Sequence, residues 1–306
     1  MKYLLLVCFP YLSLFLFLSG IVSRVVSWAK SPVPFRIPLV SGQELSLPWV
    51  KASRLESPPS KGWVVLRLLT EAVFFRSLLR GETFRLKGER LIFSNRRYLW
   101  FFSLLFHLSM LVIILRHLRF FFEPVPDFVL FLQQLDGIFE LSHPTVLLST
   151  VLFTSALFYL LSRRIFDERA RFVSLPSDYV ILLLLLSVAI TGILSKHFFR
   201  TDLVEIKRLI LGLLSFTPYV PKDVSPFFYL HLLSVCLLFA IIPWTKVVHM
   251  AGILMSPTRN LPNTSRRERH INPWDYPVKV RTYEEYKKEF GEVMKAQGLD
   301  AEERGD

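Results

Sequence analysis

The chain has 306 residues, 52% of them hydrophobic, and a formal net charge of +12. Several uncharged apolar segments reach the roughly 20 residues that cross a bilayer core. Because only helices or closed barrels satisfy their backbone in lipid, we predict an all-α polytopic membrane protein. Its positive charge then indicates cytoplasmic loops rather than a nucleic-acid partner. The two cysteines, Cys8 and Cys236, form no CxxC pair, which excludes an iron–sulfur or c-type haem motif in this chain.

The first 97 residues are predicted to form one membrane helix and a basic cytoplasmic loop. Residues 3–23 carry no charge and Arg24 follows them, so we expect a retained helix, within residues 1–29, with its N-terminus outside. A signal peptide is the competing interpretation, but no small-residue cleavage motif precedes the basic stretch. In the loop, residues 30–97, the segment 61–80 is apolar but interrupted by charged side chains, which predicts an amphipathic helix at the membrane surface.

Residues 98–255 are predicted to be a core of four further transmembrane helices. The expected spans are residues 98–118, 144–161, 178–195 and 226–253. Acidic and basic loops alternate between them, except for the mixed loop 196–225, where residues 199–216 could form a second interfacial helix. A polar tail, 256–306, follows. Because basic loops stay in the cytoplasm, the pattern predicts five spans in all, with the N-terminus outside and the C-terminus inside.

Four histidines lie inside two of the predicted spans: His107 with His117, and His231 with His249. Ionisable side chains are costly in a membrane and are functional candidates there, and neutral imidazole is a common axial ligand of haem iron. Since the two spans run in opposite directions, depths match only for His117 with His231, near the outside, and His107 with His249, near the cytoplasm. We therefore predict two haems b, stacked across the membrane, with these imidazoles as axial iron ligands.

The two histidine spacings are unequal. Along an α-helix, the ten residues from His107 to His117 span roughly 15 Å, and the eighteen from His231 to His249 span roughly 27 Å. The first pair also lies about 80° apart around its helix, whereas the second pair shares one face. A distortion, expected near Pro243, must absorb this mismatch.

Charged side chains near the histidines are candidates for further roles. Arg116 and Lys246 could pair with haem propionates. Arg119 could bind a quinone carbonyl or a propionate, and Glu123 could accept a quinol proton. For the cations, the alternative is ordinary snorkelling of the side chain to the membrane interface. For Glu123, the alternative is that it is a charged residue of the external loop with no role in quinol chemistry.

The spacings H-x9-H and H-x17-H resemble those of the di-haem cytochrome b (gamma) subunit of respiratory nitrate reductase. A closer resemblance is to the cytochrome b subunits of heterodisulfide-reductase-like menaquinol oxidoreductase complexes of sulfate reducers (DsrM/HmeC type). The stretches that carry it include RHLRFFFEPVP at 116–126, FFRTDLVEIKRLILGLLSFTP at 198–218, and a tail with SPTRN at 256–260 and HINPW at 270–274. The tail is specific to this second group.

The resemblance implies a function. Members of the family oxidise menaquinol near the outer haem and pass electrons through the inner haem to a cytoplasmic iron–sulfur subunit that resembles the catalytic chain of heterodisulfide reductase. Further partners that it implies are a periplasmic multihaem cytochrome c, a periplasmic iron–sulfur protein and a second quinone-interacting membrane subunit. In the tail, an aromatic and basic mixture that includes Trp274, Tyr283 and Arg281 suits docking to such a partner.

Three alternatives stay open. The chain could anchor another cytoplasmic reductase, as the nitrate reductase gamma subunit does. It could be a proton or ion transporter with histidine relays, although the predicted spans contain almost no carboxylates. It could also be a membrane anchor without haem. A reduced-minus-oxidised absorbance spectrum distinguishes the haem protein from the last two.

Overall fold

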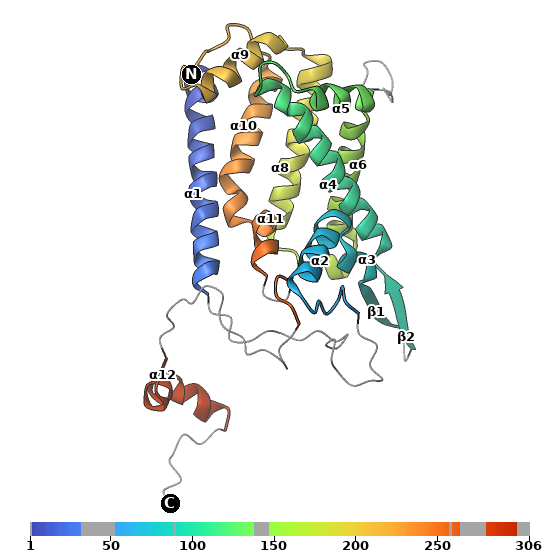
Figure 1. Ribbon diagram of the computed structural model, residues 1–306, viewed down its shortest axis with the longest axis vertical. Coiled ribbons are helices and arrows are strands. Elements are labelled where there is room, and N and C mark those ends of the chain that lie inside the picture. Colours follow the sequence, from blue (N-terminus) through green and yellow to red (C-terminus); the bar gives the residue numbers. More distant parts are fainter. Residues whose placement is uncertain are drawn as a thin grey trace, which may run out of the picture.

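The computed structural model describes residues 2–31, 53–87, 90–137, 147–256, 259–263 and 280–298. Long helices run side by side through its main body (Figure 1). They are α1 (Phe9–Lys30, preceded by a π-helical turn, Leu4–Cys8), α4 (Arg97–His117), α6 (Leu148–Phe166), α8 (Pro176–Ile193) and α10 (Pro226–Ile241). In space, α1 packs on α10, α10 on α8, α8 on α6 and α6 on α4. One apolar core joins α4, α6 and α8. A second joins the first turns of the α1 segment to α9 (Leu203–Leu214) and α10.

Local sequence signals account for where two of these helices begin. Both α8 and α10 start with a proline at their first position, which suits its fixed backbone angle. The hydroxyl of Ser225 caps α10 by accepting from the amide of Phe227, at 3.3 Å. In α8 the carboxylate of Asp178 reaches back to the amide of Leu175, at 3.0 Å.

Among the described residues, four helices are long and apolar enough to cross a membrane by length and composition. They are Leu4–Lys30, Arg97–Phe120, Pro176–Phe198 and Pro226–Trp244. They match the first, second, fourth and fifth predicted spans, and the protein is a multi-pass membrane protein. The predicted third span, 144–161, corresponds to α6, whose last turn carries Arg163 and Arg164 and which is not among the four. The start of that span lies outside the described residues, and five spans in an N-out, C-in arrangement stay a prediction.

The predicted fifth span is not one continuous helix. α10 ends at Ile241, two short 3-10 turns follow (Ile242–Trp244 and Lys246–Val248), and α11 spans only His249–Gly252. Pro243 has no amide to continue the ladder, and Thr245, in the extended conformation, separates the two turns. α1 holds this break, because Arg24 Nε donates to the Pro243 carbonyl at 3.0 Å, and a Cβ at Gly20 would lie 2.6 Å from the Pro243 ring. The distortion expected near Pro243 is therefore present, as a break rather than a kink.

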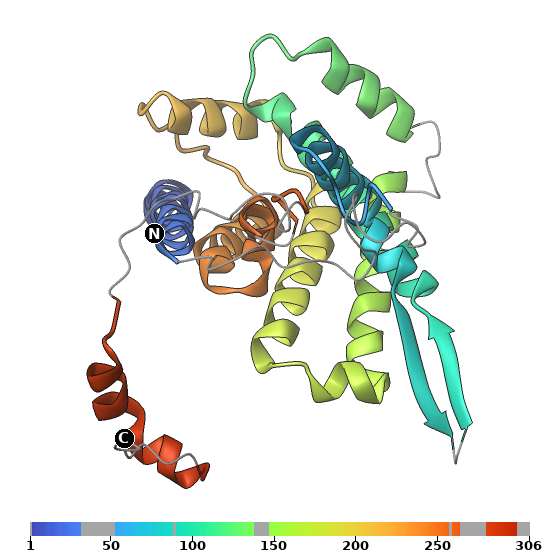
Figure 2. The same cartoon turned by 60° about the horizontal axis from the view of Figure 1, so that its bottom comes forward.

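The two ends of the bundle carry different elements (Figure 1). The end with α5 (Asp127–Gly137) and α9 (Leu203–Leu214) is called the outer end, after the predicted topology. α9 falls inside the predicted interfacial segment 199–216. The opposite, inner end carries α2 (Lys61–Phe74), α3 (Arg76–Arg80) and an antiparallel hairpin of β1 (Glu82–Lys87) and β2 (Arg90–Asn95), which extends away from the helices in Figure 2.

The amphipathic helix expected at 61–80 is present but interrupted, because Phe75 separates α2 from α3. The hairpin is the one feature of the described chain that departs from the predicted all-α architecture. α7 (Glu168–Phe172) connects α6 to α8, and α12 (Tyr283–Ala296) lies apart from the bundle in both ribbon views. Of the predicted docking tail, Trp274 lies outside the described residues.

Candidate haem site

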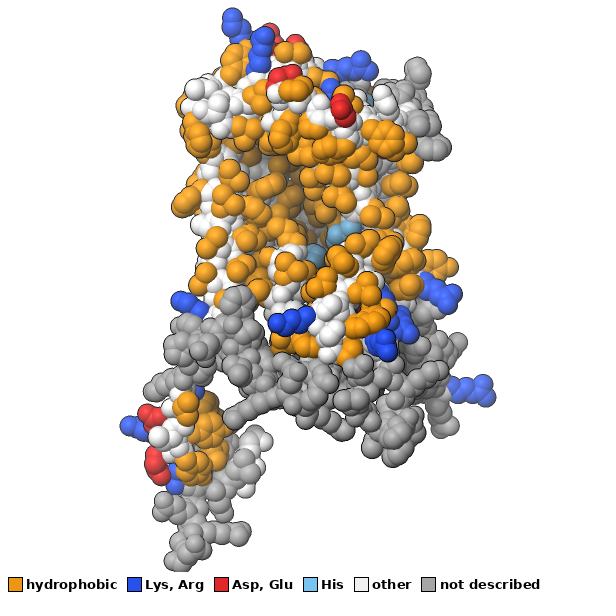
Figure 3. Space-filling view, in the orientation of Figure 1, with side chains coloured by type: hydrophobic (Ala, Val, Ile, Leu, Met, Phe, Trp, Pro, Cys, Tyr) orange, Lys and Arg blue, Asp and Glu red, His pale blue; other side chains and the backbone are white. Residues whose placement is uncertain are grey.

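The structure brings His107, His117, His231 and His249 together in two pairs. The ring centroids of His117 and His231 are 6.4 Å apart, with an angle of 27° between the ring planes. Those of His107 and His249 are 6.2 Å apart, at 77°. These are the same pairs that follow from matching depths. The face of the molecule in Figure 3 is hollowed between α10 and α4, and histidine side chains are visible in the lower part of this hollow.

Both ring separations fit an iron atom between two imidazoles. An imidazole nitrogen binds a transition metal at about 2.0 Å and its ring centroid lies about 1 Å further back, so two axial imidazoles on one metal would have centroids roughly 6 Å apart. Within the described residues, no cluster of three or more histidine, cysteine, aspartate or glutamate side chains could hold a metal ion. A haem iron would take at most two protein ligands, because the porphyrin supplies the other four, so two imidazoles per site are enough for it.

Hydrogen bonds set the tautomer of every ring. The Nδ1 atoms of His107, His117 and His249 lie 2.7, 2.7 and 2.8 Å from backbone carbonyl oxygens, and that of His231 lies 3.0 Å from the Val188 carbonyl. A carbonyl only accepts, so each Nδ1 carries the proton and donates it. The Nε2 lone pair is then available to a metal, which is the usual arrangement of a ligating histidine.

The neighbours of the two pairs differ. At the outer pair, α8 presents Gly192, where a Cβ would lie 3.1 Å from Cε1 of His231. At the inner pair, the rings of Phe75 and Phe106 pack edge-on against His107, with centroids 4.8 and 4.9 Å from it. The outer imidazole therefore needs a residue without a side chain beside it, whereas aromatic rings bracket the inner one.

Comparison with known proteins identifies a matching family and two relatives. Residues 63–262 match the family model of the nitrate reductase gamma subunit. The chain is also 39% identical, over 298 residues, to the Hdr-like menaquinol oxidoreductase cytochrome b-like subunit of Archaeoglobus fulgidus, an alignment that covers 95% of this chain and 89% of the relative. The subunit of the same description from Archaeoglobus profundus is 39% identical over 284 residues, 89% of this chain and 84% of the relative.

The chain belongs to the nitrate reductase gamma subunit family. Within it, the chain is a cytochrome b-like membrane subunit of the Hdr-like menaquinol oxidoreductase type. A cytochrome b-like subunit implies haem b and electron transfer, and a place in a complex of several subunits. The described histidine pairs provide this family member with suitable residues for that cofactor.

The two cations suggested for haem propionates are engaged with carboxylates. Arg116 forms a buried ion pair with Asp136 of α5 and donates to the Ser149 hydroxyl of α6, at 3.0 Å. Lys246 lies 2.6 Å from Asp178 of α8. Asp136 lies in the segment between the predicted spans 98–118 and 144–161, yet its side chain is buried. Nothing in the local sequence indicates these partners, which are distant along the chain.

The two outer residues suggested for quinol chemistry lie just past His117. Arg119 donates to the side-chain oxygen of Gln133 in α5, at 2.9 Å. Glu123 forms an ion pair with Lys207 of α9, and its own side chain is 67% exposed. Nearby is an open pocket of ≈ 670 Å³. It is lined by Phe121, Arg208, Leu211, Gly212, Leu214, Ser215, Thr217 and Tyr219.

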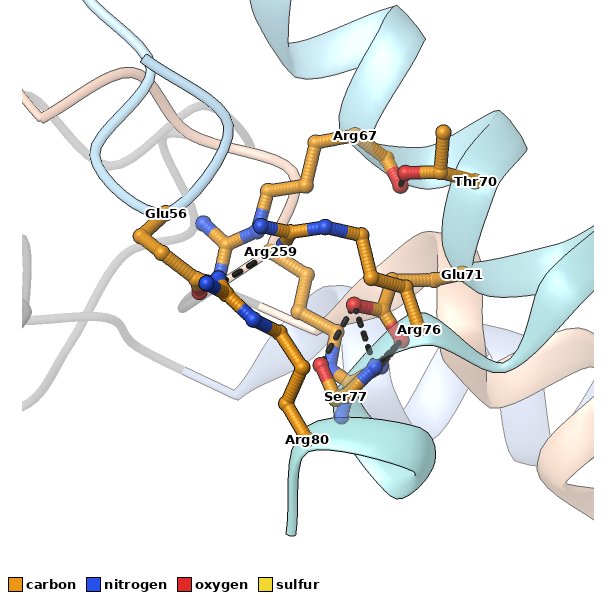
Figure 4. A network of polar contacts seen from close by, with 8 residues as sticks. All are labelled: Glu56, Arg67, Thr70, Glu71, Arg76, Ser77, Arg80 and Arg259. Carbon is orange, nitrogen blue, oxygen red and sulfur yellow. Dashed lines mark hydrogen bonds and ion pairs between the residues drawn. The ribbon is translucent and has the colours of Figure 1, made fainter. Parts of the chain in front are cut away.

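Sequence reasoning missed a polar network at the inner end of this family member (Figure 4). Glu71 and Arg67 of α2 are buried, while the other side of α2 exposes apolar side chains. Glu56 accepts from Arg76 and Arg80, at 2.7 and 2.6 Å. Burial raises the pKa of Glu56, but these two arginines outweigh it and hold the pKa below its ordinary value. The signal in the sequence was the set of charges that interrupt residues 61–80.

Proposed function

We propose that this chain carries electrons from menaquinol, at the outer end of the bundle, to a cytoplasmic iron–sulfur subunit that resembles the catalytic chain of heterodisulfide reductase. The observation that supports this best is the meeting of four histidines in two pairs, each with Nδ1 bonded to a carbonyl and with ring centroids 6.2 or 6.4 Å apart. Two haems b, when bound, would supply one-electron transfer. The protein contributes the axial imidazoles and fixes their orientation.

The charged residues near the pairs have roles in this proposal. Arg116 keeps its Nε buried and without a hydrogen-bond partner in the described structure, so that edge of the guanidinium suits a propionate oxygen. The Lys246 side chain is 59% exposed and can turn from Asp178 toward a propionate at the inner pair. Each would thus hold the cofactor while its carboxylate partner limits the local positive charge.

Menaquinol oxidation is assigned to the outer end. Glu123 and Arg119 lie within six residues of His117, next to the pocket that begins at Phe121. An exposed carboxylate there can accept a quinol proton and release it to the outside, and Arg119 can donate a hydrogen bond to a quinone carbonyl. The relatives' description as menaquinol oxidoreductase subunits supports a quinol substrate.

The remaining partners follow from the family. We propose the same complex, with a periplasmic multihaem cytochrome c, a periplasmic iron–sulfur protein and a second quinone-interacting membrane subunit. α12 offers a docking helix for the cytoplasmic subunit, since Tyr283, Tyr286 and Val293 expose one apolar side of it. The second candidate, an anchor for a different cytoplasmic reductase, is separated by identifying the subunits that co-purify.

Haem content tests the central assignment. In the purified full-length chain, b-type absorbance bands and two haems per chain are expected. His117→Ala and His231→Ala should each remove the outer haem alone, and His107→Ala and His249→Ala the inner haem alone. His197→Ala, a histidine at the end of α8's apolar segment, serves as the control that keeps both. A protein without b-type bands, as an ion transporter or haem-free anchor would be, refutes the proposal.

A further inference from the structure

We infer that Glu71 is a positioning residue for the inner pair. Its carboxylate fixes the backbone turn that presses the Phe75 ring against His107. The inference rests on the proposed function, because it takes His107 to be a haem ligand. Neither Glu71 nor Phe75 would touch the reacting atoms, and both would act through the orientation of the imidazole.

The starting observation is the backbone at Phe75. Its φ is 50° and its ψ 45°, the left-handed region that residues with a side chain rarely adopt. This one residue ends α2 and begins α3, and the amides of Leu78 and Leu79 both donate back to its carbonyl, at 2.9 and 3.1 Å. A residue held in this region persists only where its surroundings enforce it, and such positions gather at functional sites.

Glu71 supplies much of that enforcement. Its side chain is 4% exposed, and both carboxylate oxygens lie 3.1 Å from the amide of Ser77 in the first turn of α3. The Ser77 hydroxyl also donates to it, and Arg259, from the segment after α11, lies 3.4 Å away. The carboxylate thus caps α3 from within α2. This contact joins Glu71 of α2 to Ser77 of α3 (Figure 4). It closes the segment between them, which contains Phe75, into a turn.

A second contact ties the turn to the ligand helix. Trp100, two turns of helix before His107 on α4, donates its indole N–H to the carbonyl of Phe74 at 2.7 Å. The turn is therefore attached to α4 on one side and to the segment of Arg259, ten residues past His249, on the other. The two segments that carry His107 and His249 are therefore both linked to the turn that Glu71 closes.

The result is visible at His107. The Phe75 ring meets the imidazole at 78° with a centroid distance of 4.8 Å, and Phe106 meets it at 87°. With Nδ1 fixed to the Ser103 carbonyl, these rings limit rotation about the bond between Cβ and the ring. They leave His107 at 77° to His249, whereas the outer pair, where the ring of Phe120 lies further off, with its centroid 6.0 Å from that of His117, stands at 27°.

Electron paramagnetic resonance of the oxidised protein is sensitive to the angle between the ring planes of His107 and His249. Nearly perpendicular axial imidazoles give low-spin iron a highly anisotropic signal, and more parallel planes a less anisotropic one. Phe75→Gly favours the left-handed turn but removes the ring, and Glu71→Gln keeps the ring but weakens the cap. Each should shift the signal and the midpoint potential of the inner haem and leave the outer haem unchanged. Phe74→Ala, which removes the neighbouring and 58% exposed phenyl group, is the matched control.

The outcomes separate the two proposals. If wild-type protein holds two haems, and Phe75→Gly and Glu71→Gln both retain them with an unchanged inner signal, the positioning role is wrong and the proposed function stands. A shift that affects both haems alike, or that Phe74→Ala reproduces, also overturns it as a general loss of structure. If His107→Ala removes no haem, the proposed function itself fails.

Discussion

Gly192 offers a direct test of the outer pair, because the three atoms nearest to a methyl group there all belong to the ring of His231. The Cβ of an alanine would lie 3.1 Å from Cε1 and 3.3 Å from Nδ1 of His231. Ordinary carbon contacts start near 3.5 Å, so the ring must move away from α8 by a few tenths of an ångström. Val188 is also on α8, so that movement lengthens the hydrogen bond from Nδ1 of His231 to the Val188 carbonyl, which is 3.0 Å long in the structure.

The cost follows from that bond. A buried hydrogen bond contributes about 1 kcal/mol, and 1.4 kcal/mol is tenfold in an equilibrium constant. Gly192→Ala should therefore weaken retention of the outer haem roughly fivefold, and Gly192→Val should abolish it. Haem per chain and the resolved potentials of the two haems measure this.

The control is Gly62→Ala in α2, where a Cβ would meet nothing within 4 Å. It should leave both haems in place. A Gly192→Val protein that retains an unaltered outer haem would refute the reasoning, since His231 would then tolerate a side chain where the structure leaves no room for one.

Three further predictions concern charged residues. Glu123→Gln should slow quinol-driven haem reduction with both haems still bound, and an unchanged rate removes Glu123 from the mechanism. Arg116→Leu leaves a buried carboxylate unpaired and should destabilise the protein by about 3 kcal/mol, seen as a lower Tm, and replacing Asp136 as well should recover most of that. The pKa of Glu56 is lowered in the folded protein, so ionised Glu56 stabilises the folded state at pH values above its ordinary pKa of 4.5. This stabilisation is lost as the pH falls through the pKa of the folded state. Between neutral and acidic pH, the free energy of unfolding should therefore fall less in Glu56→Gln than in the wild-type protein. An equal fall in both proteins would show that the arginine contacts contribute nothing.

The sequence was sufficient for features that depend on depth along a helix. Apolar length predicted four of the membrane helices, and the opposite directions of the two segments that carry the paired histidines predicted which histidines meet. The spacing mismatch and Pro243 together indicated a distortion where the structure has one. Each of these inferences used only the rise of a helix and the order of the loops.

The features that could not be predicted depend on contacts between distant segments. The charges in residues 61–80 indicated an amphipathic helix, but a helical pattern does not tell which side faces the protein. In the structure the polar side of α2 is the buried one, because Arg259, nearly two hundred residues away, reaches Glu71. The burial of Asp136 could not be predicted for a similar reason, since its partner Arg116 lies on another helix.

The break at Pro243 resolves the unequal spacing more fully than a kink would. From His107 to His117 is ten residues, and from His231 to the end of α10 at Ile241 is also ten, so both segments rise roughly 15 Å. α10 thus ends at about the depth of His107. The following seven residues must bring the chain sideways rather than deeper, which an extended residue and two short 3-10 turns permit and a continuous helix does not. A continuous helix would place His249 roughly 12 Å too deep to meet its partner. The contacts of Gly20 and Arg24 with Pro243 therefore serve the inner pair, although α1 contributes no ligand to it.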